Sequence, residues 1–406
     1  MSQEIEKAHP RRGRSAEVYS TPNKTLFRSA ERVVLWLLGG TVLGTGAAVM
    51  IFELATGRWP DLVVSQSFAR DAFAVAAGVG AAIGLVVSYR RQKSVEDEAL
   101  TQRYSSAADQ MGHVKAAVRL AGVTAMARLA DDWEQQRQMC VDVLCAYLRM
   151  PCDTSDAHQY AEEGQVRKTV MRLIANHVKE KGVSGISWSN LDFDLSGSVL
   201  EGVWFDEAAF SGVVSFIGAT FSSVAWFELA TFSSEASFIG ATFSSQTSFD
   251  GATFSGGAWF ELATFSSQTS FDGATFSGGA WFGEATFSGV ASFDGATFSS
   301  EASFIGATFS SQTSFGEATF SGWARFIGAT FSGGAWFELA TFSSVASFGE
   351  ATFSGETSFD GATFSSVVSF IGATYLDSST GQPVPWQQLL SGIPDPPPAN
   401  FKGLDL

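Results

Sequence analysis

Residues 216–238 read FIGATFSSVAWFELATFSSEASF, and this stretch decides the fold. Its phenylalanines stand alternately 5 and 6 residues apart, and the alternation continues without a break from Phe205 to Phe370, a range that holds 31 phenylalanines. A sequence that resembles itself at a fixed short period is the signature of a solenoid, in which each repeat packs mainly on its neighbours. The sequence therefore predicts a solenoid over residues 190–376.

A small residue stands two positions before each phenylalanine, as in Ala219 before Phe221 and Thr247 before Phe249. Residues i and i−2 of a strand point to the same side. We therefore expect the ring and the small residue to point inward together, and the residues between them to point outward.

The small-x-Phe pattern resembles the pentapeptide-repeat family, and in particular its Phe-rich, membrane-anchored bacterial members. A strict five-residue spacing at the start of the repeats strengthens the resemblance. The family fold implies a right-handed quadrilateral β-helix, with four short sides in each coil. The five-residue spacing is seen at Leu195, Leu200, Phe205 and Phe210.

The residue after each phenylalanine indicates the length of one coil. At intervals of 22 residues from 206 to 360, this residue is acidic at seven of eight positions. At the same interval from 217 to 371 it is acidic at one of eight positions, and isoleucine is the commonest residue. Recent duplication of 22-residue blocks is another source of such a pattern, but an 11-residue coil has hardly enough room for two phenylalanine rings. We expect about eight coils of about 22 residues, stacked at the ~4.8 Å spacing of neighbouring strands.

Two apolar runs precede the repeats. Residues 33–52 contain no charged side chain, and about 20 apolar residues are enough to span a bilayer. The second run, 72–89, is shorter and rich in Ala and Gly, and basic residues follow it directly. Together the runs predict a two-helix transmembrane hairpin over 33–89.

Lys and Arg are more frequent before and after this predicted hairpin than in its connecting loop, 53–71. Such an asymmetry places the basic flanks in the cytoplasm. The sequence therefore predicts a multi-pass protein of the inner cell membrane with both termini cytoplasmic. The basic segment 1–32 is predicted to be disordered.

Residues 94–182 are predicted to form a helical adaptor between the hairpin and the solenoid. Apolar residues recur at helical spacing in 114–130, 139–148 and 165–179, and Pro151 ends the second of these segments. The Pro-rich segment 377–406 is expected to act as a cap or tail at the far end of the repeats.

Charge and composition limit the chemistry of the repeats. Residues 190–375 contain 18 acidic side chains and one basic one, Arg325, and they lack His, Lys and Cys. No pairing of nucleophile and base, and no ligand set for a transition metal, can be drawn from these residues. The three cysteines, Cys140, Cys145 and Cys152, lack the spacing of a disulfide framework. The sequence predicts a protein that is not an enzyme and that uses no cofactor.

Outward positions of the repeats supply the candidate interaction surface. An acidic column indicates docking of a basic protein or binding of Ca²⁺, although solubility alone would also favour it. An isoleucine column indicates an interface, such as one with a second copy of the chain, although β-propensity alone would also favour it. Outward tryptophans are candidate contact anchors. The acidic column is Glu228, Asp250, Asp272 and Asp294; the isoleucines are Ile217, Ile239, Ile305 and Ile327; the tryptophans are Trp204, Trp226, Trp259, Trp281 and Trp336.

The function expected from the sequence is that of a membrane-tethered scaffold that presents an acidic solenoid to the cytoplasm. Its expected partners are the lipid bilayer, a protein with a basic surface and a second copy of the chain, but not nucleic acid. The resemblance also implies an alternative, a DNA-mimic regulator of a nucleic-acid enzyme such as a topoisomerase. A third alternative is the binding of Ca²⁺ or other cations along the carboxylate column.

Overall fold

The computed structural model describes residues 62–152, 155–179, 182, 185–376 and 401–402. The chain divides into two compact units, Met1–Asp97 and Glu98–Leu406. The described part of the first unit belongs to helix α2 (Leu62–Met111), which continues into the second unit.

The structure corrects the membrane prediction. The run 72–89 is part of the 50-residue helix α2, which continues past it through Arg90 and Arg91. Half of this run is Ala or Gly, whose side chains offer little apolar surface to hydrocarbon. None of the helices that the structure describes combines the length and the apolar character of a membrane span. The predicted localisation, a multi-pass inner membrane protein with both termini cytoplasmic, is therefore wrong, and the predicted hairpin is not supported.

Several predicted segments lie outside the described residues. They are the basic segment 1–32, the first predicted span 33–52 and most of the C-terminal segment 377–406.

Three helices of the second unit form a small apolar core in the region predicted to be a helical adaptor. α3 (Ala116–Asp132) packs on both α4 (Arg137–Arg149) and α5 (Ala157–His177), and a short 3-10 helix, η1 (Glu134–Gln136), joins α3 to α4. α4 ends before Pro151 because the residue that precedes a proline, Met150, takes an extended conformation. The fully buried residues of this core include Val123, Met126, Leu144, Leu148 and Ile174.

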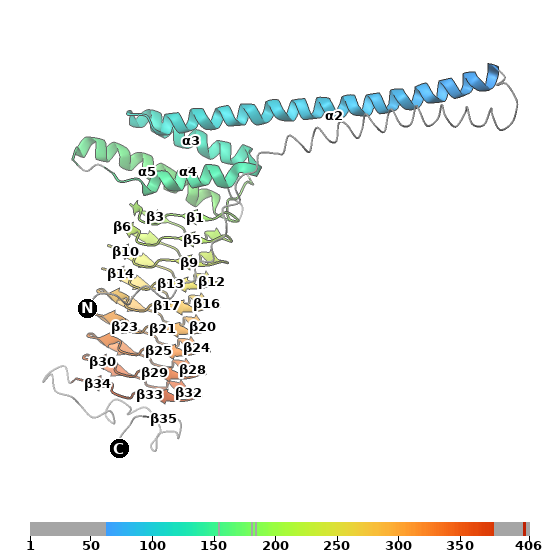
Figure 1. Cartoon of the computed structure of the whole chain (residues 1–406). Helices are drawn as coiled ribbons and strands as arrows, with labels where there is room; N and C mark the ends of the chain where they lie inside the picture. The colour runs from blue at the N-terminus through green and yellow to red at the C-terminus, as the bar shows by residue number, and fades with distance from the viewer. Residues whose placement is uncertain (1–61, 153–154, 180–181, 183–184, 377–400, 403–406) are drawn as a thin grey trace, which may run out of the picture. The chain divides into compact units, whose positions relative to one another are not determined.

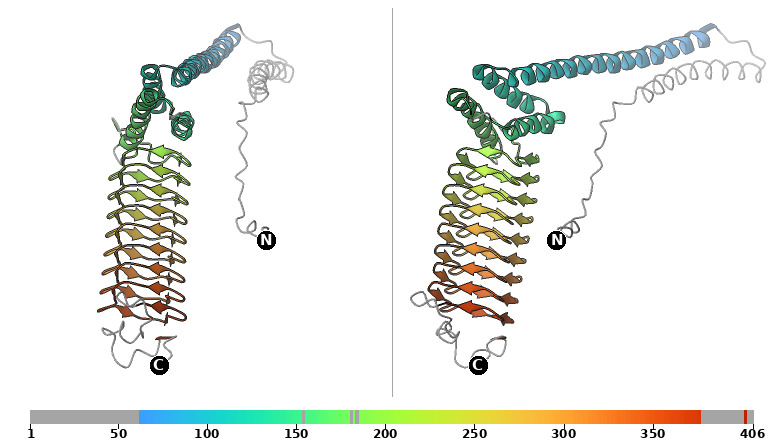
Figure 2. Two further views of the ribbon diagram at one scale, coloured as in Figure 1. Left: turned by 90° about the vertical axis from the view of Figure 1, so that its left-hand side faces the viewer. Right: turned by 60° about the vertical axis from the view of Figure 1, so that its left-hand side comes forward.

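The solenoid consists of strands of two residues each, which stack coil upon coil into four parallel sheets (Figures 1 and 2). Each strand pairs in parallel with the equivalent strand of the next coil, as Thr242 does with Thr264 and Ala258 with Ala280. Paired residues such as Thr242 and Thr264 are 22 positions apart in the sequence, whereas the first strands of the β1 and β2 sheets pair at an offset of 21, as Val199 does with Thr220. The predicted coil length and the predicted number of about eight coils are confirmed.

We name each sheet by its first strand, and the β1 and β3 sheets lie on opposite sides of the solenoid. Their strands carry Ser, Trp or Arg at most outward positions. The β1 sheet contains β1 (Phe193–Asp194), β5 (Val214–Ser215), β9 (Ala236–Ser237), β13 (Ala258–Trp259), β17 (Ala280–Trp281), β21 (Ala302–Ser303), β25 (Ala324–Arg325), β29 (Ala346–Ser347), β33 (Val368–Ser369) and β35 (Phe401–Lys402). The β3 sheet contains β3 (Val203–Trp204), β7 (Ala225–Trp226), β11 (Thr247–Ser248), β15 (Thr269–Ser270), β19 (Ala291–Ser292), β23 (Thr313–Ser314), β27 (Ala335–Trp336) and β31 (Thr357–Ser358).

The β2 and β4 sheets form the other two sides, and nearly all of their strands read Thr-Phe, with threonine outward and phenylalanine inward. The β2 sheet contains β2 (Val199–Leu200), β6 (Thr220–Phe221), β10 (Thr242–Phe243), β14 (Thr264–Phe265), β18 (Thr286–Phe287), β22 (Thr308–Phe309), β26 (Thr330–Phe331), β30 (Thr352–Phe353) and β34 (Thr374–Tyr375). The β4 sheet contains β4 (Ala209–Phe210), β8 (Thr231–Phe232), β12 (Thr253–Phe254), β16 (Thr275–Phe276), β20 (Thr297–Phe298), β24 (Thr319–Phe320), β28 (Thr341–Phe342) and β32 (Thr363–Phe364).

Four columns of phenylalanine rings fill the solenoid. Within a column nearly all successive rings are parallel, as in Phe238 and Phe260, whose centroids lie 4.7 Å apart with an interplanar angle of 0°. Between columns the rings meet edge to face, as in Phe238 and Phe249, with centroids 5.4 Å apart at 85°, or at a tilt, as in Phe238 and Phe243, at 40°. The parallel and edge-to-face geometries both suit the quadrupole of an aromatic ring. The expectation that the rings point inward with a small residue beside each is confirmed, since the Phe and Ala residues in the middle coils are fully buried.

The turns that follow strands of the β1 and β3 sheets need a left-handed residue two positions after the inward phenylalanine. Glycine occupies nine of these turns, where its φ lies between 63° and 72°. Glu or Leu occupies seven, with φ of 56–58°, although this conformation costs an L-residue roughly 1–2 kcal/mol. These seven residues are Glu207, Leu229, Leu262, Glu284, Glu317, Leu339 and Glu350.

The helices close the N-terminal end of the solenoid. The amide of Ala209 donates to the carbonyl of Val178 at 2.7 Å, and Lys179 forms an antiparallel bridge with Ala208. The indole of Trp188 stacks on His177, with centroids 4.0 Å apart, and its Nε1 donates to Asp131 at 2.9 Å. The edge of the first coil is therefore covered, which removes a template for strand pairing with another chain.

At the C-terminal end, the structure describes one further pairing. β35 extends the β1 sheet beyond β33, with Val368 paired with Phe401. The two residues of β35 belong to the segment that the sequence predicts to be a cap or tail.

Candidate interaction surface

The acidic column lies at the turns that follow the β3-sheet strands, and three of its carboxylates link one coil to the next. Asp250 accepts hydrogen bonds at Oδ1 from the hydroxyl of Ser270 and from the amide of Asp272. Asp272 makes the same two contacts with Ser292 and Asp294 in the following coil. We call this arrangement the Asp–Ser ladder.

The third step of the Asp–Ser ladder connects Asp294 to the next coil, where Ser314 and the amide of Gly316 donate to its Oδ1. Asp250 and Asp272 are half-buried, whereas Glu228 and Asp294 are exposed. Sequence reasoning missed this structural role. The signal was the Ser-Phe-Asp triplet that recurs in successive coils, which places a hydroxyl beside the carboxylate of the preceding coil.

The isoleucine column lies at the equivalent turns after the β1-sheet strands. Ile217, Ile305 and Ile327 are 45%, 37% and 36% exposed, and Ile239 is half-buried. The column is interrupted by Glu261 and Gly283, so its apolar surface is not continuous. Its role as an interface stays a prediction.

Most of the outward tryptophans are less exposed than a contact anchor was expected to be. Trp204 is 57% exposed, whereas Trp226, Trp259, Trp281 and Trp336 are half-buried. Trp259 and Trp281 stack on each other on the β1 sheet, with centroids 3.9 Å apart. These indoles therefore bury part of their area against neighbouring coils.

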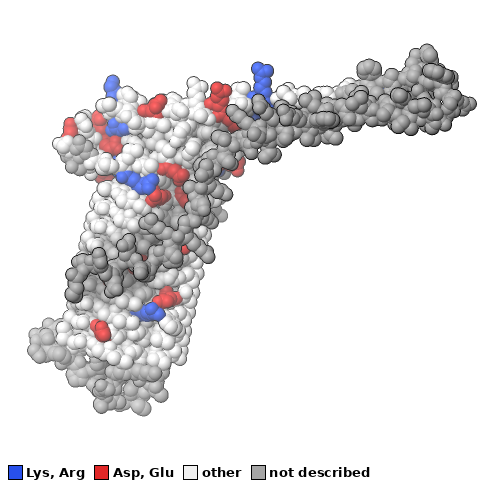
Figure 3. Space-filling model, in the orientation of Figure 1, with Lys and Arg blue, Asp and Glu red and all other residues white. Residues whose placement is uncertain are grey.

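The only basic side chain of the repeats is already engaged. Arg325 on β25 forms an ion pair with Glu301, with Nη1 and Oε1 3.1 Å apart, and its guanidinium carbon lies 4.9 Å from the centroid of the Trp323 ring. In the view of Figure 3, charged side chains gather over the helices, and the visible solenoid surface carries few of them.

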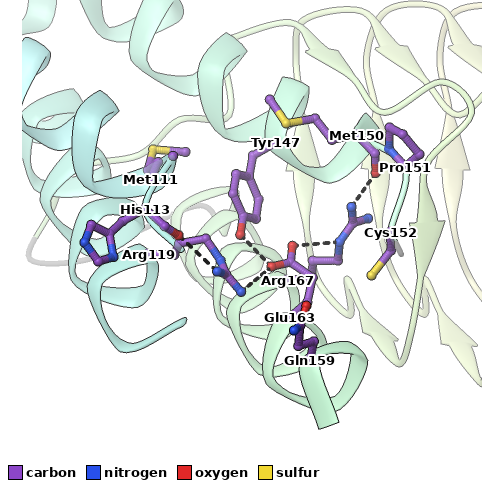
Figure 4. A pocket seen from close by; sticks show the side chains of 11 residues that line it. Met111, His113, Arg119, Tyr147, Met150, Pro151, Cys152, Gln159, Glu163 and Arg167 are labelled. Atoms are coloured by element: carbon purple, nitrogen blue, oxygen red, sulfur yellow. Dashed lines mark hydrogen bonds and ion pairs between the residues drawn. The ribbon is translucent and has the colours of Figure 1, made fainter. Parts of the chain in front are cut away.

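A cavity of about 320 Å³ in the helical core contains a cluster of charged side chains (Figure 4). Glu163 on α5 lies between two arginines, 3.0 Å from Arg119 and 3.1 Å from Arg167, and accepts a hydrogen bond from Tyr147 at 2.9 Å. Arg119 also donates to the carbonyl of Val114, and Arg167 to that of Leu148. The cluster therefore joins the α2–α3 connection and the end of α4 to α5.

Three titratable groups of the helical core, Cys140, Cys145 and Tyr147, are held in their neutral forms by raised pKa values. Burial raises the pKa of the Cys140 thiol to about 11 and that of Cys145 to about 12, and the Asp142 carboxylate adds to both shifts. Burial and the Glu163 carboxylate raise the pKa of Tyr147 to about 12. Because the thiolate is the reactive form, Cys140 and Cys145 are poor nucleophiles. Among the described residues, no three His, Cys, Asp or Glu side chains are grouped as metal ligands.

The repeats match a family of known proteins. The family model described as "Pentapeptide repeats (9 copies)" matches residues 195–242, 230–275, 249–297, 282–330, 293–341 and 326–374. No curated protein and no solved structure matches the chain. The matched segments cover the coils continuously from Leu195, and their two-residue strands agree with the short repeat of that family. Residues 195–374 therefore form a pentapeptide-repeat β-solenoid.

Proposed function

We propose that the protein is a non-enzymatic scaffold whose solenoid binds a protein partner with a basic surface. The observation that carries this proposal is the charge of the repeats. Residues 190–375 contain 18 acidic side chains against one basic one, and that residue, Arg325, is neutralised by Glu301. A cationic partner therefore approaches a surface that offers attraction and almost no repulsion.

The construction of the solenoid supports a binding role. Its stability comes from the phenylalanine columns and from contacts between neighbouring coils, so that its shape does not depend on a ligand. Outward side chains repeat in register with the strands, and the β1 and β3 sheets differ in composition from the threonine-lined β2 and β4 sheets. The solenoid thus presents a long, preorganised surface, and preorganisation lowers the entropic cost of binding.

Neither alternative function gains support from the geometry. DNA mimicry requires a dense series of free carboxylates, whereas those of Asp250, Asp272 and Asp294 accept hydrogen bonds from the next coil. The β2 and β4 sheets present columns of neutral threonine. Binding of Ca²⁺ requires six to eight oxygen ligands around one point, whereas the Asp–Ser ladder places about one carboxylate in each coil.

Site-specific photo-crosslinking in cells that make the full chain tests the scaffold proposal. A photoreactive residue is placed at Gln268, which is exposed and directly precedes β15 of the β3 sheet, and in a matched variant at Thr286 on the β2 sheet. We expect a discrete protein with a basic surface to be captured from Gln268 and not from Thr286. The yield in lysate should fall as salt is added, because screening weakens contacts between exposed charges.

Two results contradict the scaffold proposal. One is that no protein is captured at Gln268 or at Thr286. The other is an identical set of captured proteins at both positions, which indicates contact without a preferred side.

A further inference from the structure

The outer face of the β3 sheet contains a hollow of about 400 Å³ formed by three consecutive coils. β19, β23 and β27 stack in register there, with Ser292 beside Ser314 and Ser314 beside Trp336. The side chains that line the hollow are Val290, Ser292, Asp294, Gln312, Ser314, Trp336 and Glu338.

Two glycines create this hollow. Gly316 occupies the position of the acidic column between Asp294 and Glu338 and adds no side chain of its own, and Oδ1 of Asp294 lies 3.0 Å from the place where its Cβ would be. Gly334 allows the indole of Trp336 to lie over the backbone, because a Cβ at this position would meet Cη2 of the indole at 2.4 Å. The result is a recess with an aromatic wall.

The recess is negatively charged. Oδ1 of Asp294 is held by Ser314 and by the amide of Gly316 at 2.8 Å, which orients the carboxylate. Glu338 and Gln312 are exposed at the edges of the recess. The only basic residue of the repeats, Arg325, belongs to the opposite β1 sheet and is paired with Glu301. Two carboxylates thus face the recess without a neighbouring cation of the repeats.

We propose that this recess binds the cationic end of an arginine side chain from a basic partner. The inference rests on the proposed scaffold function and names the group that the scaffold recognises. A guanidinium stacks on an indole by cation–π attraction and donates hydrogen bonds to carboxylates in a plane, whereas a lysine ammonium is more strongly hydrated. Val290 and the Trp336 ring provide apolar surface for the aliphatic part of the arginine side chain.

The solenoid contains a matched control. Trp281 on the β1 sheet also lies over a glycine, Gly279, but it is stacked on Trp259 and is followed by Gly283 instead of an acidic residue at the turn. Trp281→Ala therefore removes the same side chain from the opposite side of the solenoid and leaves the recess intact.

The test measures binding of a fluorescein-labelled hexa-arginine peptide to the full chain by fluorescence anisotropy. Hexa-citrulline, which has nearly the same shape and no charge, is the control peptide. We expect Trp336→Ala to weaken binding of hexa-arginine about tenfold, as the loss of one partly desolvated cation–π contact implies, and Trp281→Ala to leave it unchanged. Glu338→Gln should weaken binding as well, and hexa-citrulline should not bind.

A second variant separates loss of binding from loss of folding. Gly334→Val displaces the indole, and the coil that contains Val224 and Trp226 shows that the fold accepts valine at this position. We expect Gly334→Val to weaken hexa-arginine binding while the circular dichroism spectrum remains that of the wild type.

The inference is overturned if the Trp336 and Trp281 variants bind hexa-arginine equally, or if hexa-citrulline binds as tightly as hexa-arginine. Failure here is distinguishable from failure of the scaffold proposal. If a basic partner is captured from Gln268 but Trp336→Ala leaves hexa-arginine binding unchanged, only the proposal for the recess is wrong. If hexa-arginine binding depends on Trp336 but no partner is captured, the proposal for the recess is supported and the scaffold proposal is wrong.

Discussion

At the scale of single residues, seven turns of the solenoid carry Glu or Leu in a left-handed backbone conformation that favours glycine. Glu284 has a φ of 56° and is exposed, so that its side chain gains little burial in return for the left-handed conformation. Gly295 occupies the equivalent turn on the β3 side with a φ of 64°, and the space where a Cβ would lie is open. The two residues form a matched pair for measuring the cost of this conformation.

We predict that Glu284→Gly stabilises the protein by about 0.5–1 kcal/mol. Relief of the left-handed strain, roughly 1–2 kcal/mol, exceeds the greater chain entropy that glycine adds to the unfolded state, about 0.5–1 kcal/mol. Gly295→Glu should destabilise the protein by a similar amount. Chemical denaturation followed by circular dichroism measures both changes, and equal midpoints for the two variants would contradict the argument.

The Asp–Ser ladder gives a second prediction for single residues. Asp272→Ala removes the acceptor of two hydrogen bonds and should cost roughly 1–2 kcal/mol of unfolding free energy, whereas Asp272→Asn retains one acceptor oxygen and should cost less. Asp360→Ala is the control, because the described residues make contacts with the Asp360 amide but no hydrogen bond to its carboxylate. Equal losses for Asp272→Ala and Asp360→Ala in denaturant titrations would show that the ladder contributes nothing.

At the scale of secondary-structure elements, the helices and the coils differ in their response to alkali. The raised pKa values of Cys140, Cys145 and Tyr147 mean that folding keeps these groups protonated. Their contribution to stability is complete below pH 9, the ordinary pKa of a thiol, and is lost as the pH rises through about 11–12. Residues 185–376 contain no Cys and no Lys.

We therefore predict that the helices unfold between about pH 9 and 12 before the solenoid does. The helical circular dichroism signal at 222 nm should fall in this range while the β signal persists. Cys145→Ala, which removes one of the titrating groups, should move the transition to higher pH. Simultaneous loss of both signals would contradict the prediction.

At the scale of the whole molecule, the single coil is the unit that can be removed. We predict that deletion of residues 271–292 leaves a folded solenoid, because Ser270 is then followed by Phe293 in the same register and by Asp294 in the place of Asp272. Small-angle X-ray scattering should show a particle shorter by about 4.8 Å. Deletion of residues 271–275 alone breaks the alternation of phenylalanines and should prevent cooperative folding of the coils that follow.

The sequence predicted the repeats better than it predicted the surface or the first unit. The spacing of Phe205 to Phe370 determines which residues point inward, so the coil length and the core followed from a local pattern. The Asp–Ser ladder required knowledge of which serine lies beside which carboxylate in the next coil. The recess at Trp336 depends on two missing side chains. The apolar run 72–89 led to a wrong prediction because its composition was considered apart from the long helix that contains it.

The four parallel sheets have a mechanical consequence. Their hydrogen bonds run along the axis of the solenoid, so tension applied between its two ends loads successive coils in series. The coil with the weakest contacts to its neighbour unfolds first, and the force then acts on the next coil. The force–extension curve of a stretched molecule should therefore show a series of similar force peaks, one for each coil that unfolds. We expect the coils farthest from the helices to unfold first.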